Sequence, residues 1–168
     1  MKHFVHTILF LLVLNYSCIS IKYSTTGASI SPNVKTASIG YFQNRATLGP
    51  TGLSQKFTDQ LREKIQKNTS LAIVSGSGDV SFEGEIVNYE ISTQALQSNE
   101  TESKDRLTIT VHVKFFNSVE PKYNYDATLS RFQDFSRNVT FDQIEKQLID
   151  KIMDELTEDI FNKAFSNW

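Results

Sequence analysis

Residues 107–116 read Leu-Thr-Ile-Thr-Val-His-Val-Lys-Phe-Phe, and this stretch decides the fold class. Apolar side chains stand at the odd positions from Leu107 to Phe115, and polar ones stand at the even positions from Thr108 to Lys114. Successive side chains of a β-strand point to opposite faces of its sheet, so the alternation predicts a strand with one buried face. The polar positions indicate that the other face of the sheet meets water or a partner.

The segments around this strand predict further strands. Apolar patterns indicate them over residues 34–42, 71–74, 80–91 and 125–135. Within residues 80–91 the apolar side chains first stand at even positions, at Val80, Phe82 and Ile86. They then change to odd positions, at Val87, Tyr89 and Ile91. We therefore predict a β-bulge or a twist beside Gly84. Loops or turns are predicted over residues 44–52, 76–79, 94–105 and 117–123.

Two amphipathic helices are predicted from apolar residues at steps of four. The first stripe consists of Leu53, Phe57, Leu61 and Ile65, and its helix should begin near Thr51 or Ser54 and end at Asn68. The second stripe consists of Ile144, Leu148, Ile152, Leu156, Ile160, Ala164 and Trp168. Thr140 and Gln143 precede it with the spacing of a capping box. Helices and consecutive strands in this order predict an α+β two-layer sandwich in a single domain over residues 33–168.

The N-terminus has the composition of a secretory signal. Lys2 and His3 give a positive start, residues 4–14 are almost all apolar, and the small Ser17 precedes Cys18. The apolar run is too short to span a bilayer, so we predict a signal peptide over residues 1–17. A cysteine at this place resembles the lipobox of bacterial lipoproteins, in which the cysteine is lipidated and becomes the first residue.

The cysteine count favours lipidation, because Cys18 is the only cysteine in the chain. Acylation of Cys18, for example with palmitate, would hold the domain on a membrane surface, and residues 18–32 would form a flexible tether. The lipobox is atypical at Asn15, where leucine is usual, and at the bulky Tyr16. The alternative is a plain secretory signal followed by an unmodified thiol.

The composition excludes several kinds of site. A net charge of −2 provides no basic field for nucleic acid. His112 is the one histidine outside the signal, which excludes a metal site with two histidine ligands. A Ser-His-Asp triad would have to use His112 as its base. His112 lies mid-strand between Thr110 and Lys114, so we interpret it as a solvated surface residue. We predict that the chain is not an enzyme and needs no cofactor.

Charged residues on the strands leave two interpretations open. Glu83 and Glu85 could share one face as a carboxylate pair, or they could be two exposed charges on an edge strand. Basic residues are scattered over the strands and the turn after them: Arg106, Lys114, Arg131 and Arg137. If these line one sheet surface they could bind anionic groups, and the alternative is ordinary cross-strand charge pairing.

Five segments resemble the LptE family, the lipopolysaccharide-assembly lipoproteins of the outer membrane, in the form found in Bacteroidetes. They are residues 31–39 (SPNVKTASI), 41–46 (YFQNRA), 106–111 (RLTITV), 130–135 (SRFQDF) and 159–168 (DIFNKAFSNW). The resemblance implies two helices on one face of a four-stranded, mainly antiparallel sheet in the order β-α-β-β-β-α. It also implies a non-enzymatic protein anchored by lipid on the periplasmic side of the outer membrane.

The resemblance further implies two partners. Members of the family plug an LptD-type outer-membrane β-barrel, assist its assembly and bind lipopolysaccharide on its way to the cell surface. Basic residues that would contact the phosphorylated lipid A region correspond in pattern to Lys114 and Arg131, with Arg106 behind them. Two other functions remain open: a lipid-anchored binding module of another envelope secretion or adhesion complex, and a small surface hydrolase using His112 with a serine.

Overall fold

The computed structural model describes residues 30–94 and 103–165. The predicted signal peptide, Cys18, most of the tether and Trp168 lie outside the described residues. Among the helices that are described, none has both the length and the apolar character needed to cross a membrane.

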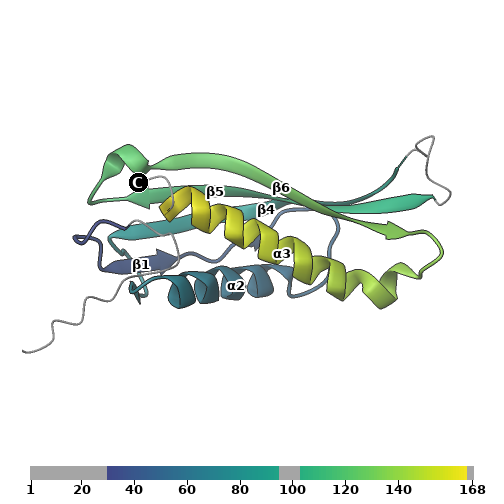
Figure 1. The fold of residues 1–168 in the computed structure, drawn as a ribbon, viewed down its shortest axis with the longest axis horizontal. Helices are drawn as coiled ribbons and strands as arrows, with labels where there is room; N and C mark the ends of the chain where they lie inside the picture. The colour runs from purple at the N-terminus through teal and green to yellow at the C-terminus, as the bar shows by residue number, and fades with distance from the viewer. Residues whose placement is uncertain (1–29, 95–102, 166–168) are drawn as a thin grey trace, which may run out of the picture.

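Two helices cover one face of a twisted sheet, and within the described residues the other face carries no helix (Figure 1). The elements in chain order are β1 (Thr36–Ile39), β2 (Gln43–Asn44), α2 (Leu53–Asn68), β3 (Ala72–Ile73), β4 (Val80–Thr93), β5 (Lys104–Asn117), the 3-10 helix η1 (Pro121–Tyr123), β6 (Tyr125–Ser136) and α3 (Phe141–Phe165). The predicted α+β sandwich is confirmed.

The sheet has six strands, so the expectation of four is wrong. Its order is β3-β1-β4-β5-β6, and β2 pairs with β4 beside this path. The predicted strand over 34–42 is divided: β1 ends at Ile39, the N–H of Gly40 still donates to the carbonyl of Phe82 at 2.8 Å, and pairing resumes at Gln43 in β2. Strands β2 and β3 contain two residues each, which is too short to give an alternating pattern.

Parallel and antiparallel pairing divide the sheet into two parts. β1 pairs in parallel with β3 and with β4, and α2 supplies the crossover that parallel neighbours need. β4, β5 and β6 pair antiparallel and form the long part of the sheet. β4 is therefore an interior strand, which rules out the interpretation of Glu83 and Glu85 as charges on an edge strand.

The irregularity in β4 lies at Val87 and not beside Gly84. The register against β5 shifts between Ile86 and Asn88, so Val87 is the extra residue of a bulge. This shift lets Ile86 and Tyr89 both face the core, which explains the parity change. Gly84 pairs regularly with Val113 and is needed for close approach, since an added Cβ would lie 2.1 Å from the carbonyl oxygen of His112.

The core lies between the helices and the apolar face of the sheet. Fully buried rings join the two layers: the Phe82 and Phe115 centroids are 4.9 Å apart, and that of Phe165 lies 5.9 Å from Phe82. The hydroxyl of Tyr89 donates to Glu145 Oε1 at 2.6 Å and links β4 to α3. Burial and the Glu145 carboxylate raise the pKa of Tyr89, so the phenol remains a donor at neutral pH.

The helix ends agree only partly with the predicted caps. α2 begins at Leu53 with Gly52 as its N-cap at φ +87°, and no side chain caps it. The predicted caps Thr51 and Ser54 are therefore not used. α3 begins at Phe141, directly after Thr140 as predicted.

Candidate interaction surface on the uncovered face of the sheet

The face of the sheet opposite the helices is polar, and we call it the outer face. It carries the alternate residues of three strands: Ser81, Glu83 and Glu85 of β4, Thr108, Thr110, His112, Lys114 and Phe116 of β5, and Asp126, Thr128, Ser130, Phe132 and Asp134 of β6. Their neighbours in sequence on β5 are the buried core residues, so one alternating pattern builds both faces. None of the described helices covers the predicted polar face (Figure 1).

Opposite charges stand side by side across three strands of the outer face. Lys114 lies between Glu83 on β4 and Asp126 on β6, and its Nζ is 3.7 Å from Asp126 Oδ2. His112 Nε2 lies 2.5 Å from the other oxygen of Asp126. This hydrogen bond, with a smaller contribution from Lys114, holds the pKa of Asp126 below its usual range.

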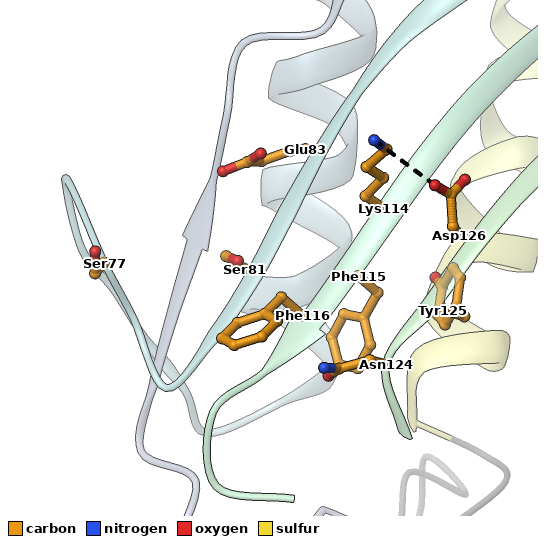
Figure 2. Close-up of a pocket in the computed structure, with 9 residues that line it drawn as sticks. All are labelled: Ser77, Ser81, Glu83, Lys114, Phe115, Phe116, Asn124, Tyr125 and Asp126. Atoms are coloured by element: carbon orange, nitrogen blue, oxygen red, sulfur yellow. Dashed lines mark ion pairs between the residues drawn. The ribbon is translucent and has the colours of Figure 1, made fainter. Parts of the chain in front are cut away.

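An open hollow of about 640 Å³ lies at this end of the outer face (Figure 2). The polar groups around it are those of Ser77, Ser81, Glu83, Lys114, Asn124 and Asp126. The ring of Phe116, which is 52% exposed, adds an apolar surface. An ammonium group beside an exposed ring can bind an anionic group on a molecule that also has apolar parts.

Arg106 lies on the outer face but far from this hollow. It stands eight residues from Lys114 on the same strand, a separation of about 27 Å. Its guanidinium donates to both carboxylate oxygens of Asp134 at 2.6 and 2.9 Å, and it stacks 3.5 Å from the ring centre of Phe132. The Asp134 carboxylate raises the pKa of Arg106, and Arg106 lowers the pKa of Asp134.

Arg131 lies on the opposite face of the sheet, the one that the helices cover. Its guanidinium donates to both carboxylate oxygens of Asp159 on α3, at 2.6 and 2.7 Å. The structure therefore brings none of the three predicted lipopolysaccharide-binding residues together. Each of the four scattered basic residues has a carboxylate partner in its own chain, and for Arg137 the partner is Asp105, at 3.2 Å.

No arrangement of catalytic or metal-binding groups is found among the described residues. His112 has Asp126 as its hydrogen-bond partner, and no hydrogen bond links it to a serine in this part of the chain. No three residues among His, Cys, Asp and Glu are grouped as a metal ion would require, within residues 30–94 and 103–165.

Phe116 is one of the members of the hollow that the sequence analysis did not single out; Ser81, Asn124 and Asp126 are others. Phe116 stands at a polar position of the alternation directly after Phe115, and this break in the pattern was the available signal. The other members could not have been assigned to one place, because β4, β5 and the turn before β6 meet there only through the strand order.

A family model described as LptE, lipopolysaccharide-assembly, matches residues 34–164 of this chain. No curated protein sequence matches the chain. The matched range contains all the described strands and helices except the last residue of α3.

Solved structures share the fold at low sequence identity. A minor lipoprotein from Acinetobacter baumannii gives a TM-score of 0.53 at 17% identity over 77% of this chain and 91% of that one. The hypothetical protein CT253 from Chlamydia trachomatis gives a TM-score of 0.53 at 13% identity over 80% of this chain and 99% of that one. At these identities the likeness concerns the fold alone.

Proposed function

The chain belongs to the LptE family of lipopolysaccharide-assembly proteins, and from this we propose that it plugs an LptD-type outer-membrane β-barrel. In this role it assists assembly of the barrel and takes part in lipopolysaccharide transport to the cell surface. The family match over residues 34–164 is the observation that carries the proposal. The role is a binding role, and the chain carries out no reaction.

The polar outer face supports a position inside a barrel. The lumen of an outer-membrane barrel is polar, so a plug must present hydrogen-bonding groups to it. Thr108, Thr110 and His112 present such groups on the outer face, which none of the described helices covers. The sheet itself separates that surface from the apolar core, which lies between the sheet and the two helices.

Lipidation of Cys18 completes the proposal. Acyl chains on this residue would anchor the domain in the inner leaflet of the outer membrane, on the periplasmic side. Residues 18–32 would then tether the domain to the membrane. Such a tether lets the domain enter a neighbouring barrel without a membrane-spanning helix of its own.

Lys114 is the strongest of the three candidates for contact with lipopolysaccharide. Its side chain is 59% exposed and, within residues 30–94 and 103–165, forms a single ion pair, with Asp126, at 3.7 Å. Arg106 and Arg131 are each held by two short hydrogen bonds to one carboxylate. A lipid A phosphate can therefore compete for Lys114 at a smaller cost than for either arginine.

The experiment that tests the function is an affinity purification of the full-length protein from its own outer membrane in mild detergent, followed by mass spectrometry. An LptD-type barrel in about equal amount would support the proposal. Recovery of another envelope secretion or adhesion complex without this barrel would contradict it, and would make the chain a lipid-anchored binding module of that complex.

A further inference from the structure

β6 forms an edge of the sheet and lacks most of the devices that normally protect an edge; its charged residues are Asp126, Arg131 and Asp134. Its pairing with β5 is unbroken from Tyr125 to Ser136, without a bulge. It contains no proline, glycine or lysine, and its single arginine, Arg131, is bound to Asp159 on the helix side. Natural edge strands usually carry prolines, bulges or outward lysines, which prevent pairing with another chain. A long and regular edge without proline, bulge or lysine therefore indicates a pairing site.

The register identifies which backbone groups are available. The N–H of Arg137 donates to the carbonyl of Ser103 at 3.3 Å. Ser103 and Arg137 follow Lys104 and Ser136 as the next opposed pair, so this hydrogen bond extends the ladder between β5 and β6. In an antiparallel pair, hydrogen-bonded positions alternate, so the odd residues of β6 point their backbone groups toward β5. The even residues point theirs away from the sheet. These residues are Asp126, Thr128, Ser130, Phe132 and Asp134.

These outward groups have no partner within the part of the chain that the structure describes. No backbone hydrogen bond besides those of the strand ladder uses the N–H or C=O of residues 126–134. β6 lies at the margin of the sheet, and α3 crosses the helix side of the sheet without covering this edge (Figure 1). An extended segment lying along this edge could form main-chain hydrogen bonds with the outward N–H and C=O groups of all five residues.

We propose that the edge of β6 binds an extended segment of the barrel partner as one additional strand. The inference rests on the proposed function for the identity of the partner. Main-chain hydrogen bonds would provide the affinity, and the side chains beside the edge would select the segment.

The surroundings of the edge determine the chemistry of the segment. On the outer face its side chains would lie beside Thr128 and Ser130, which are exposed. On the helix side they would enter an open groove of about 500 Å³ between β6 and α3, beside Arg131, Asp159 and Lys163. Most side chains beside both faces of the added strand would thus be polar, with Phe132 on the outer face and Leu129 in the groove as the apolar exceptions. A lipid-facing strand of a barrel has one apolar face, so the occupant is a polar loop or terminal segment and not a wall strand.

A second copy of this chain fits the edge less well. A two-fold antiparallel pairing of β6 with β6, centred on Ser130, uses the whole edge. It places Asp126 of one copy opposite Asp134 of the other, twice, and like charges directly opposite each other are destabilising. The segment we propose therefore has no acidic residue opposite either aspartate.

The test removes the outward N–H groups and keeps the ladder to β5. Proline at residue 128 or 130 deletes an N–H that β5 does not use, and proline is tolerated on an edge strand in this orientation. The variants are Thr128→Pro and Ser130→Pro, and the matched controls Thr128→Ala and Ser130→Ala keep the N–H. Each full-length variant is purified from the outer membrane in mild detergent, and the co-purified LptD-type barrel is quantified.

We expect each proline variant to recover at least tenfold less barrel than its alanine control, with melting temperatures that agree within about 5 °C. Equal recovery of the barrel by the proline and alanine variants would overturn the inference and leave the proposed function intact. Absence of the barrel even with the unmodified chain would overturn the proposed function, and with it this choice of partner.

A second measurement needs no variant and covers the case in which a proline variant does not fold. Amide hydrogen exchange of the unmodified protein is compared with and without the barrel. We expect exchange at Thr128, Ser130 and Phe132 to slow at least tenfold in the complex. Unchanged exchange at these three amides would overturn the inference. A cross-link from a photoreactive residue at 128 to a second copy of the chain, or to a membrane-spanning strand of the barrel, would also overturn it.

Discussion

Lys114 differs from the arginines in how tightly its own chain holds it, and this difference is measurable. We expect Lys114→Ala to weaken binding of purified lipopolysaccharide about fivefold to tenfold, because a charged hydrogen bond contributes about 1.5–3 kcal/mol before competition with Asp126. Arg131→Ala should change this affinity by less than about twofold, because Arg131 is bound to Asp159 on the other face. Binding of lipopolysaccharide to each variant by fluorescence titration checks the prediction.

Arg131→Ala also has an expected effect of its own. Loss of the half-exposed pair with Asp159 should lower stability by about 0.5–1 kcal/mol, since exposed ion pairs contribute little. The double variant Lys114→Ala/Arg131→Ala should bind lipopolysaccharide as weakly as Lys114→Ala alone, with barrel binding intact. A further loss of affinity in the double variant would show that Arg131 contacts the ligand.

Gly84 is the residue that permits the closest packing in the sheet. In Gly84→Ala the new Cβ would lie 2.1 Å from the His112 carbonyl oxygen and 2.6 Å from Cε1 of Phe42. We expect a loss of about 3 kcal/mol, because the backbone of β5 must move to relieve the clash. Urea unfolding followed by circular dichroism measures the change.

Two further variants separate the sources of this loss. Gly76→Ala is the control, because its added Cβ meets no atom within 4 Å and only its φ of +109° is strained. In Phe42→Leu/Gly84→Ala the ring contact is gone and the carbonyl contact remains. If the double variant regained the stability of Phe42→Leu, the close approach to His112 would not be the cause.

At the scale of an element, the bulge in β4 makes one residue dispensable. Deletion of Val87 would leave Ile86 and Asn88 adjacent, and every side chain of β4 would keep its present face. We expect this variant to fold cooperatively, and thermal unfolding measures it.

Deletion of Thr110 in the regular strand β5 is the matched comparison. It would turn two or three of the buried side chains of β5 to the outer face. At about 1.5–3 kcal/mol for each side chain, this loss is comparable to the whole stability of a small domain. A cooperative transition in this variant, or its absence in the Val87 deletion, would contradict the assigned bulge.

The elements that the sequence predicts are those with several repeats of one period. The alternation in β5 and the steps of four in α2 and α3 extend over many residues, so their type and face could be inferred. Strands β2 and β3 have two residues each and form because β4 and β1 offer free edges. The bulge was misplaced because a glycine inside a strand often marks a bulge, whereas here Gly84 pairs regularly with Val113 and the extra residue is Val87.

At the scale of the whole molecule, the site depends on the order of the strands. The polar face and the place of Lys114 on it follow from the alternation in β5. The parity of Tyr125, Ala127 and Leu129 already assigns Arg131 to the other face, yet its partner Asp159 belongs to a helix 28 residues later. The exposed edge of β6 could not be inferred, because no local pattern tells which strand is last in a sheet.

Ion pairs that join separate elements make the whole molecule sensitive to acid. The pKa values of four carboxyl groups are lowered: Asp79 by the N–H groups of Lys35 and Thr36 at the start of β1, Asp126 by His112, Asp134 by Arg106, and Glu158 on α3 by Lys64 on α2. In the unfolded chain these groups have pKa values of about 3.9 for Asp and 4.3 for Glu.

The sign of the effect follows from proton counts. Between the folded and unfolded pKa values the unfolded chain binds more protons, so stability increases with pH in that window. We expect the full contribution above about pH 5, and a loss as the pH falls below 4 through the lowered folded values. Urea midpoints at pH 7, 5, 4 and 3 measure it. The Asp79→Asn variant should be less stable than the unmodified chain at pH 7. Its stability should fall less between pH 5 and pH 3, because the amide does not titrate. An unchanged urea midpoint from pH 7 to pH 3 in the unmodified chain would contradict this account, as would an Asp79→Asn variant with the same acid loss.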